Sequence, residues 1–185
     1  MRALAPAPTV DLPMGLLRKG DDHQRTRYRM HEKLFSIGDD SWIEDDDGNR
    51  VFKVDGKALR VRKTFELKDT SGQELLKIQE RKLHIHDTMK IEREGGTAAT
   101  VKKALITPLR ERFSIDLDDG GELTAKGNIV DHEYSIEGDG GKLAEVSKRW
   151  FRVRDTYGIE IAPGQDDALL LAVSVCIDEM SDRGR

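Results

Sequence analysis

The chain has 185 residues, a length that suggests one domain or one domain with a tail. Its formal net charge of −4 excludes a bulk binder of polyanions, so no nucleic-acid partner is expected, and contact with an anionic membrane requires a local basic patch. The single cysteine, Cys176, excludes an internal disulfide and stands in an apolar run, where a buried and unreactive thiol is expected. The first ten residues lack the sustained apolar core of a signal peptide, which favours a cytoplasmic location.

Residues 1–27 differ from the rest of the chain and predict a flexible N-terminal arm. They contain Pro6, Pro8 and Pro13, which are three of the five prolines in the chain. A short apolar stretch at residues 14–17 is followed by two basic residues, which gives the arm a basic amphipathic character. The favoured interpretation is a disordered tail, and the alternative is a patch that docks on the body, on a partner or on a membrane surface.

From Tyr28 onward, apolar and polar residues alternate with a period of two, which predicts β-strands. Phe113 and Ile115, for example, alternate with Ser114 and Asp116. Glycine and asparagine in the segments between the strands supply the positive φ angles that tight hairpins need. We expect about ten to twelve antiparallel strands in a meander. The turn clusters lie at residues 46–49, 69–72, 94–96, 118–121 and 138–141.

Residues 166–181 predict a helix that is buried on nearly every side. The ten residues 168–177 are apolar almost throughout, so this helix must be surrounded by protein or lipid. The run is shorter than the roughly 20 residues that span a bilayer. A closed barrel covers every face of a helix threaded through it and leaves no strand edge exposed. We therefore predict a mainly β fold, a closed antiparallel β-barrel around a buried hydrophobic C-terminal helix.

Three segments in order, followed by the closing helix, make the chain resemble the LURP-one-related group of the tubby C-terminal-like superfamily. The first is residues 28–38 (YRMHEKLFSIG), followed by a strand pair around Trp42 and Phe52. The second runs over residues 65–78, and the third combines Trp150 with residues 155–158 (DTYG). The resemblance makes residues 28–185 one barrel domain, and the arm lies outside it.

The resemblance implies a barrel of about twelve strands around the helix. It also implies several candidate ligands, which differ between branches of the superfamily. The tubby branch binds phosphoinositides through basic residues on the outer side of the barrel, and the scramblase branch is tied to membrane phospholipids and calcium. The LURP-one branch has no established enzymatic activity. No motif in this chain matches the tubby lipid-binding residues, so none of those residues is carried over.

A filled barrel has no central cavity, so a ligand must bind its outer wall, its mouths or its loops. The strongest candidate is the run at residues 148–154, where three cations and a tryptophan would share one face of a strand. Arginine forks suit phosphate, and tryptophan suits membrane interfaces. The favoured alternative has Trp150 inside the barrel and the cations solvated, because barrel aromatics usually pack inward. The candidate anion-binding residues are Lys148, Arg149, Trp150, Arg152 and Arg154, with Arg60, Arg62 and Lys63 from a second basic run.

No metal site is predicted. His84 and His86 would share a strand face, but zinc needs further ligands and none is near them in the sequence. Of the acids that a scramblase-type calcium motif requires, only Asp155 precedes Tyr157, whereas calcium takes roughly six to eight oxygens. The acidic run at residues 44–48 lacks the spacing of an EF-hand loop and is interpreted as a solvated hairpin turn.

Catalytic motifs are absent from the sequence, which has no GxSxG elbow, no Walker A motif and no HExxH. No cofactor is predicted. We expect a non-enzymatic binding module that recognises anionic phospholipid headgroups or an acidic partner at the outer face of the barrel, in the cytoplasm or peripherally at a membrane. The alternative is a structural or protein-interaction scaffold with the arm as its docking segment. An enzyme of unrecognised type ranks third.

Overall fold

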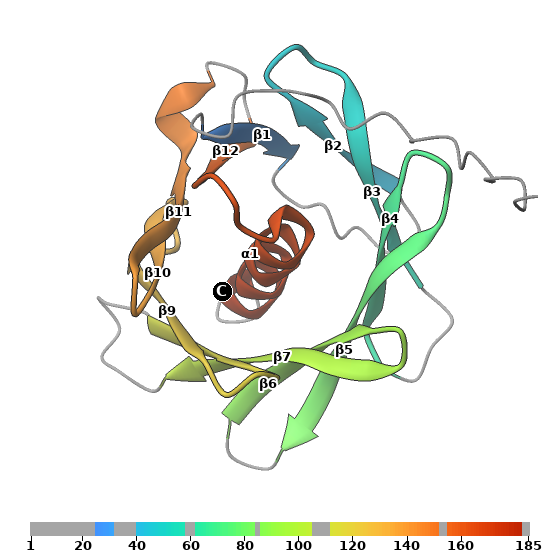
Figure 1. Cartoon of the computed structure of the whole chain (residues 1–185), viewed down its shortest axis with the longest axis vertical. Helices are drawn as coiled ribbons and strands as arrows, with labels where there is room; N and C mark the ends of the chain where they lie inside the picture. Colours follow the sequence, from blue (N-terminus) through green and yellow to red (C-terminus); the bar gives the residue numbers. More distant parts are fainter. Residues whose placement is uncertain are drawn as a thin grey trace, which may run out of the picture.

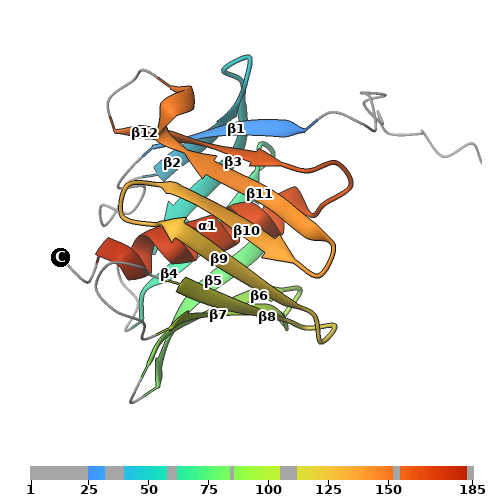
Figure 2. The ribbon, with the colours of Figure 1, turned by 90° about the vertical axis from the view of Figure 1, so that its left-hand side faces the viewer.

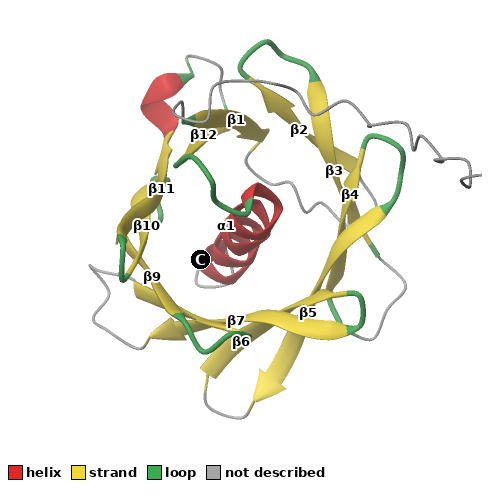
Figure 3. Cartoon of the chain, viewed as in Figure 1, coloured by secondary structure: helices red, strands yellow, loops and turns green. Residues whose placement is uncertain are grey.

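A computed structural model describes residues 25–31, 40–57, 62–83, 86–104, 112–151 and 155–182 of the chain. These residues form a closed antiparallel barrel of twelve strands around one α-helix, α1 (Asp167–Asp182), as Figures 1 and 3 show. The helix lies one residue later at each end than the predicted range of 166–181. The predicted fold class is therefore confirmed.

The twelve strands follow one another around the barrel in sequence order. They are β1 (Thr26–His31), β2 (Asp40–Asp45), β3 (Arg50–Gly56), β4 (Thr64–Asp69), β5 (Glu74–Leu83), β6 (His86–Arg93), β7 (Gly96–Ala104), β8 (Arg112–Leu117), β9 (Glu122–Asn128), β10 (Glu133–Gly138), β11 (Gly141–Ser147) and β12 (Thr156–Ile161). β1 begins two residues before the predicted start of the domain at Tyr28, and residues 1–24 of the predicted arm lie outside the described residues.

The barrel closes where β1 pairs with β12 on one side and with β2 on the other. The pairing with β12 runs over the full length of both strands and places Arg27 opposite Glu160 and Arg29 opposite Gly158. In such a meander, successive connections lie at alternate ends of the barrel. We call the end with the turns at residues 46–49 and 118–121 the helix-start end, because α1 begins there. The opposite end is the helix-finish end, and Figure 2 shows α1 running between the two.

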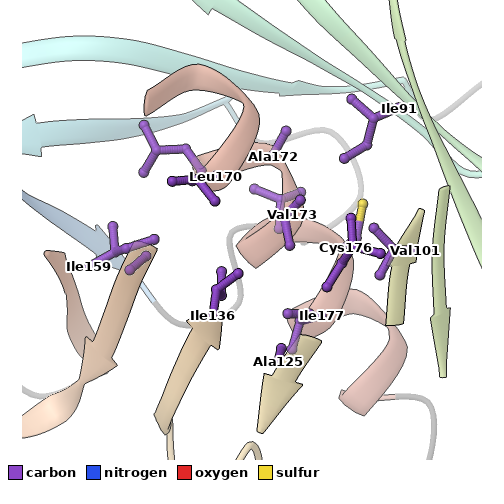
Figure 4. Close-up of a cluster of buried hydrophobic side chains, with 14 of the residues drawn as sticks. Ile91, Val101, Ala125, Ile136, Ile159, Leu170, Ala172, Val173, Cys176 and Ile177 are labelled. Atoms are coloured by element: carbon purple, nitrogen blue, oxygen red, sulfur yellow. The ribbon is translucent and has the colours of Figure 1, made fainter. Parts of the chain in front are cut away.

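The interior is filled by α1 and by the inward side chains of the strands. Every described side chain of α1 from Leu170 onward is buried. In Figure 4, Val173, Cys176 and Ile177 lie against strand residues such as Val101 and Ile136. Burial raises the pKa of the Cys176 thiol well above its usual range, as expected for an unreactive core cysteine. The barrel is thus a packed body, and its binding surfaces lie outside or at its ends.

Tight turns close the helix-start end. The carboxylate of Asp45 accepts hydrogen bonds from the backbone N–H groups of Asp47 at 3.0 Å and Asn49 at 2.8 Å. Gly48 follows with a φ of 81°, a conformation that glycine adopts without strain. The acidic run at residues 44–48 therefore forms the hairpin turn that its sequence predicts.

α1 has 16 residues. No helix in the parts of the chain that the structure describes combines the length and the apolar run needed to cross a bilayer.

Candidate anion-binding site

The basic run after β11 does not continue as a strand. Lys148–Trp150 forms a short 3-10 helix, η1, capped by Ser147. The side-chain oxygen of Ser147 accepts a hydrogen bond from the backbone N–H of Arg149 at 3.1 Å. The shared face expected for a strand is therefore not formed, although the Arg149 side chain stands 82% exposed. Arg152 and Arg154 lie outside the described residues.

Trp150 and Phe151 pack on the outer wall of the barrel, over β12. Tyr157 and Ile159 are fully buried and point inward, so Gly158 between them faces outward. A Cβ atom on Gly158 would lie 2.7 Å from a ring atom of Trp150 and 2.7 Å from one of Phe151. Glycine thus leaves room for both rings. The inward orientation favoured for Trp150 is wrong, because the chain turns outward at η1 before it enters β12.

Two arginines of β1 lie over these rings. The guanidinium carbon of Arg27 is 4.9 Å from the ring centroid of Trp150, and that of Arg29 is 4.6 Å from the ring centroid of Phe151. Both distances are typical of cation–π contacts. Because Arg27 and Arg29 are two residues apart on one strand, they share its outer face. We call Arg27, Arg29, Trp150 and Phe151 the arginine–aromatic cluster.

Two carboxylates hold the arginines in place without using all of their donors. Arg27 donates from Nη2 to Glu160 at 2.8 Å, and Arg29 donates from Nη1 to Glu44 at 3.3 Å. The Nε atoms of both arginines are shielded from solvent and have no hydrogen-bond partner among the described residues. The two side chains remain 35% and 28% exposed. The cluster therefore presents two guanidinium groups that are oriented by a ring and a carboxylate each and remain partly exposed.

The second tryptophan of the chain also lies outside the barrel. Ile43 of β2 is fully buried, so its neighbour Trp42 faces outward. The guanidinium carbon of Arg50 is 5.0 Å from the ring centroid of Trp42, and Lys53 Nζ is 5.9 Å from it. Both tryptophans of the protein thus carry cations on the outer wall.

The residues of the second predicted basic run, Arg60, Arg62 and Lys63, do not share one environment in the structure. Lys63 donates from Nζ to Glu179 of α1 at 2.5 Å, and the Glu179 side chain is only 4% exposed. Arg62 is exposed, and Arg60 lies outside the described residues. Because α1 ends here, Arg62 and Lys63 lie at the helix-finish end, as η1 does at the end of β11. The fold therefore brings the described parts of the two runs to the same end of the barrel, on different walls.

A buried polar network seals the helix-finish end. Asp178 of α1 accepts a hydrogen bond from the hydroxyl of Tyr157 at 2.7 Å, and its other oxygen lies 2.7 Å from His132 Nε2. The ring of His132 stacks on that of Tyr157 with centroids 4.3 Å apart. His132 therefore has a structural role here and fixes the end of the helix to the β9–β10 turn.

The outer wall of β3 and β4 has balanced charges. Lys57 and Lys68 each contact both Asp55 and Glu66, at distances between 2.7 and 3.1 Å. The hydrogen bonds from Lys57 and Lys68 lower the pKa of Asp55 to about 2. All four charges are used within this network, so it offers less to an external anion than the arginine–aromatic cluster does.

The structure adds little to the predictions about metal sites. No group of three or more His, Cys, Asp or Glu side chains that could hold a metal ion occurs among the described residues. His84 and the side chain of His86 lie outside them. Asp155 is exposed with a φ of 58°. A hollow of about 410 Å³ lies at the helix-start end, between the β6–β7 and β8–β9 turns, and holds none of the predicted cations.

Sequence reasoning missed Arg27 and Arg29. A signal was present, since Arg27 and Arg29 alternate with Tyr28 and Met30, as the outward and inward residues of a strand do. The contact of Arg27 with Trp150 could not be predicted from the sequence. It depends on the pairing of the first strand with the last, and the two residues are more than 120 positions apart.

The comparisons with known proteins agree with this architecture. The sequence matches the LURP-one-related family over residues 26–178. It is 26% identical over 149 residues to the uncharacterized protein YxjI of Bacillus subtilis (strain 168), covering 80% of this chain and 90% of that protein. The fold is similar to the X-ray structure of the Arabidopsis thaliana protein AT5G01750, with a TM-score of 0.62 and 17% identity, over 89% of this chain and 97% of that one.

Proposed function

This chain belongs to the LURP-one-related family, and on that premise we propose that it is a non-enzymatic binding module for anionic phospholipid headgroups. The arginine–aromatic cluster is the proposed centre of the site, with Lys148 and Arg149 beside Trp150. Arg62 and Lys63 belong to the proposal as further cations, on a different wall of the barrel. Arg152, Arg154 and Arg60 belong to the same proposal on sequence grounds. The observation that carries it is the stacking of Arg27 and Arg29 on two aromatic rings outside a filled barrel.

The chemistry of the cluster suits a phosphate at a bilayer surface. Guanidinium groups donate paired hydrogen bonds to phosphate oxygens, and stacking on a ring orients them before binding. Tryptophan favours the level of the headgroups, where its apolar body and its N–H both find partners. Glu160 and Glu44 compete with an incoming phosphate for the same donors, so the affinity depends on the added attraction of the surrounding cations and falls with salt.

A protein-interaction scaffold is the second candidate. An apolar docking face would support it, because protein interfaces centre on buried apolar groups. Val130 is the large hydrophobic side chain that stands exposed on the described surface. One such residue makes no patch, and this favours the lipid proposal over an apolar protein interface. A peripheral location at the cytoplasmic face of a membrane is part of the same proposal, which assigns no catalytic role.

Vesicle co-sedimentation across a salt series tests this function. Vesicles of phosphatidylcholine alone, with phosphatidylserine, and with a phosphoinositide are compared. We expect binding to the two anionic compositions only. Arg27→Gln combined with Arg29→Gln should weaken it by about 30-fold, from roughly 1 kcal/mol for each cation near an anionic surface. Arg152→Glu with Arg154→Glu tests the neighbouring run.

The matched control is Lys90→Gln combined with Lys102→Gln. It also removes two cations, each of which pairs with a carboxylate on the opposite wall of the barrel, Glu92 and Asp116 respectively. The control should bind nearly as the unchanged protein does. Absence of binding to every vesicle at low salt would exclude the membrane function, and equal losses in the two double variants would exclude the cluster as the site.

A further inference from the structure

Two groups of cations stacked on aromatic rings lie on neighbouring strands of the barrel. The arginine–aromatic cluster belongs to β12, β1 and the η1 segment, and the ring of Trp42 with its two cations belongs to β2 and β3. The four strands follow one another around the barrel in the order β12, β1, β2, β3, as Figure 1 shows. We call their outer face the β12–β3 wall. Neighbouring strands are about 4.8 Å apart, so three such steps place the two groups within about 15 Å of each other.

The register of the strands also brings the two groups to a similar height along the barrel. Arg29 lies opposite Gly158 of β12 on one side and opposite Glu44 of β2 on the other. Arg50 of β3 in turn lies opposite Glu44. Trp42 is two residues before Glu44, so it lies about 7 Å from this level, toward the helix-finish end. Both groups therefore belong to one compact surface along the side of the barrel and not to either end.

Cations outnumber carboxylates where the two groups meet. The cations are Arg27, Arg29, Arg50 and Lys53, and the carboxylates are Glu44 and Glu160, each of which pairs with one arginine of β1. Arg50 is exposed and stacks on Trp42, and it has no carboxylate partner among the described residues. Asp55, at the edge of the wall, is already engaged by Lys57 and Lys68. The second group therefore adds attraction for an anion to that of the arginine–aromatic cluster.

We propose that the barrel lies on its side on an anionic bilayer, with the β12–β3 wall against the headgroups and the barrel axis along the surface. The inference rests on the proposed function and adds a second contact, formed by Trp42, Arg50 and Lys53, together with the orientation. Tryptophan suits the level of the headgroups and arginine suits their phosphates, so two such contacts on one wall fix that wall against the lipid. The opposite wall, β6 to β9, lies beyond α1 at about 20 Å, which exceeds the Debye length of about 8 Å at physiological salt. Its charges therefore contribute little to binding.

Removal of the second contact tests whether it takes part in binding. Arg50→Gln combined with Lys53→Gln should weaken co-sedimentation of the full chain with phosphatidylserine vesicles by about 30-fold, as much as the loss expected for the two arginines of β1. Lys90→Gln combined with Lys102→Gln, on the opposite wall, should change it by less than about two-fold. Full binding of the Arg50 and Lys53 double variant would overturn the second contact and leave the proposed function intact. If the unchanged protein sediments with no vesicle, both proposals fall.

The two tryptophans of the chain report whether both contacts reach the lipid. Trp42→Phe leaves Trp150 as the single tryptophan, and Trp150→Phe leaves Trp42. Emission is measured with vesicles of phosphatidylserine and brominated phosphatidylcholine, whose bromines quench at short range. The two variants should be quenched to within about a factor of two of each other, because both rings stand at the level of the headgroups. Quenching of Trp150 without quenching of Trp42 would overturn the side-on orientation.

Two pairs of acids at the helix-start end distinguish a side-on barrel from one that stands on an end. Asp46 and Asp47 are exposed in the β2–β3 turn, which borders the β12–β3 wall, and Glu94 and Asp118 are exposed in turns of the opposite wall. Asp46→Asn combined with Asp47→Asn should strengthen binding to phosphatidylserine vesicles by about five-fold, because it removes two anions close to the lipid. Glu94→Gln combined with Asp118→Asn should change it by less than about two-fold. Equal gains in both variants would place the helix-start end at the lipid, and no gain in either would place the helix-finish end there, so each result would overturn the side-on orientation.

Discussion

The inner and outer faces of β1 and β12 carry different kinds of side chain. Inside, Tyr28, Met30 and Ile159 are buried in the core around α1. Outside, Arg27 and Arg29 meet the aromatic rings of the η1 segment. Adjacent residues of one strand thus serve different purposes, because successive side chains point to opposite faces. Stability is concentrated on the inner face, which leaves the outer face free to carry a ligand.

The inner face contains a few polar contacts, and these fix the helix at both ends. Tyr28 donates a hydrogen bond to Asp167 at 2.5 Å at the start of α1, and Tyr157 donates one to Asp178 near its end. Burial, together with the carboxylate of Asp167, raises the pKa of the Tyr28 hydroxyl above its ordinary value, so it remains a donor at physiological pH. The outer contacts instead join long, partly exposed side chains, which a ligand can rearrange at low cost.

The largest effect on stability should come from shortening a side chain on the inner face of the barrel. Leu171 of α1 is fully buried, so Leu171→Ala should lower the free energy of unfolding by about 2–5 kcal/mol through lost burial and a residual cavity. Urea unfolding followed by circular dichroism measures it. Val130→Ala, at an exposed site, should change stability by less than about 0.5 kcal/mol. Equal losses in the two variants would contradict a barrel that depends on its filled interior.

An intermediate effect on stability is expected at Gly158, where two aromatic rings pack closely on the outer face. Gly158→Ala places a methyl group 2.7 Å from both aromatic rings, so the rings must move outward. We expect a loss of about 1–3 kcal/mol in stability and a red-shifted Trp150 emission, read in a Trp42→Phe background. Gly140→Ala is the control, since no atom lies within 4 Å of its new carbon. Unchanged emission in Gly158→Ala would mean that the rings do not rest on β12.

The smallest effect concerns the charge network of β3 and β4. Lys57 and Lys68 lower the pKa of Asp55 to about 2, from an unfolded value of about 3.9. The group therefore contributes stability that is complete above about pH 4 and is lost as the pH falls toward about 2. Asp55→Asn should reduce the loss of stability across this window in acid unfolding experiments. A profile as steep as that of the unchanged protein would assign the acid sensitivity to other carboxylates.

The local sequence pattern was enough to predict the architecture of the barrel, but not the candidate anion-binding site. The alternation through Phe113 and Ile115 identified strands, and the apolar run of α1 required a closed surround. At residues 148–150 the same alternation predicted a strand, and this prediction was wrong because the segment forms the 3-10 helix η1. The local signal for that change is Ser147, a residue type favoured at the N-cap of a helix, and it stands at the end of an otherwise strand-like run.

The family, the meander of strands and the helix inside them could be predicted from the amino-acid pattern, because they depend on the periodicity and composition of short segments. Three features emerged with the folded barrel: Trp150 lies outside, Arg27 and Arg29 pack over the rings of Trp150 and Phe151, and Lys63 is hydrogen-bonded to Glu179. Those contacts depend on how the first strand meets the last and on where the helix ends inside the barrel. Closure of the barrel sets these long-range distances, and no neighbouring residues encode them.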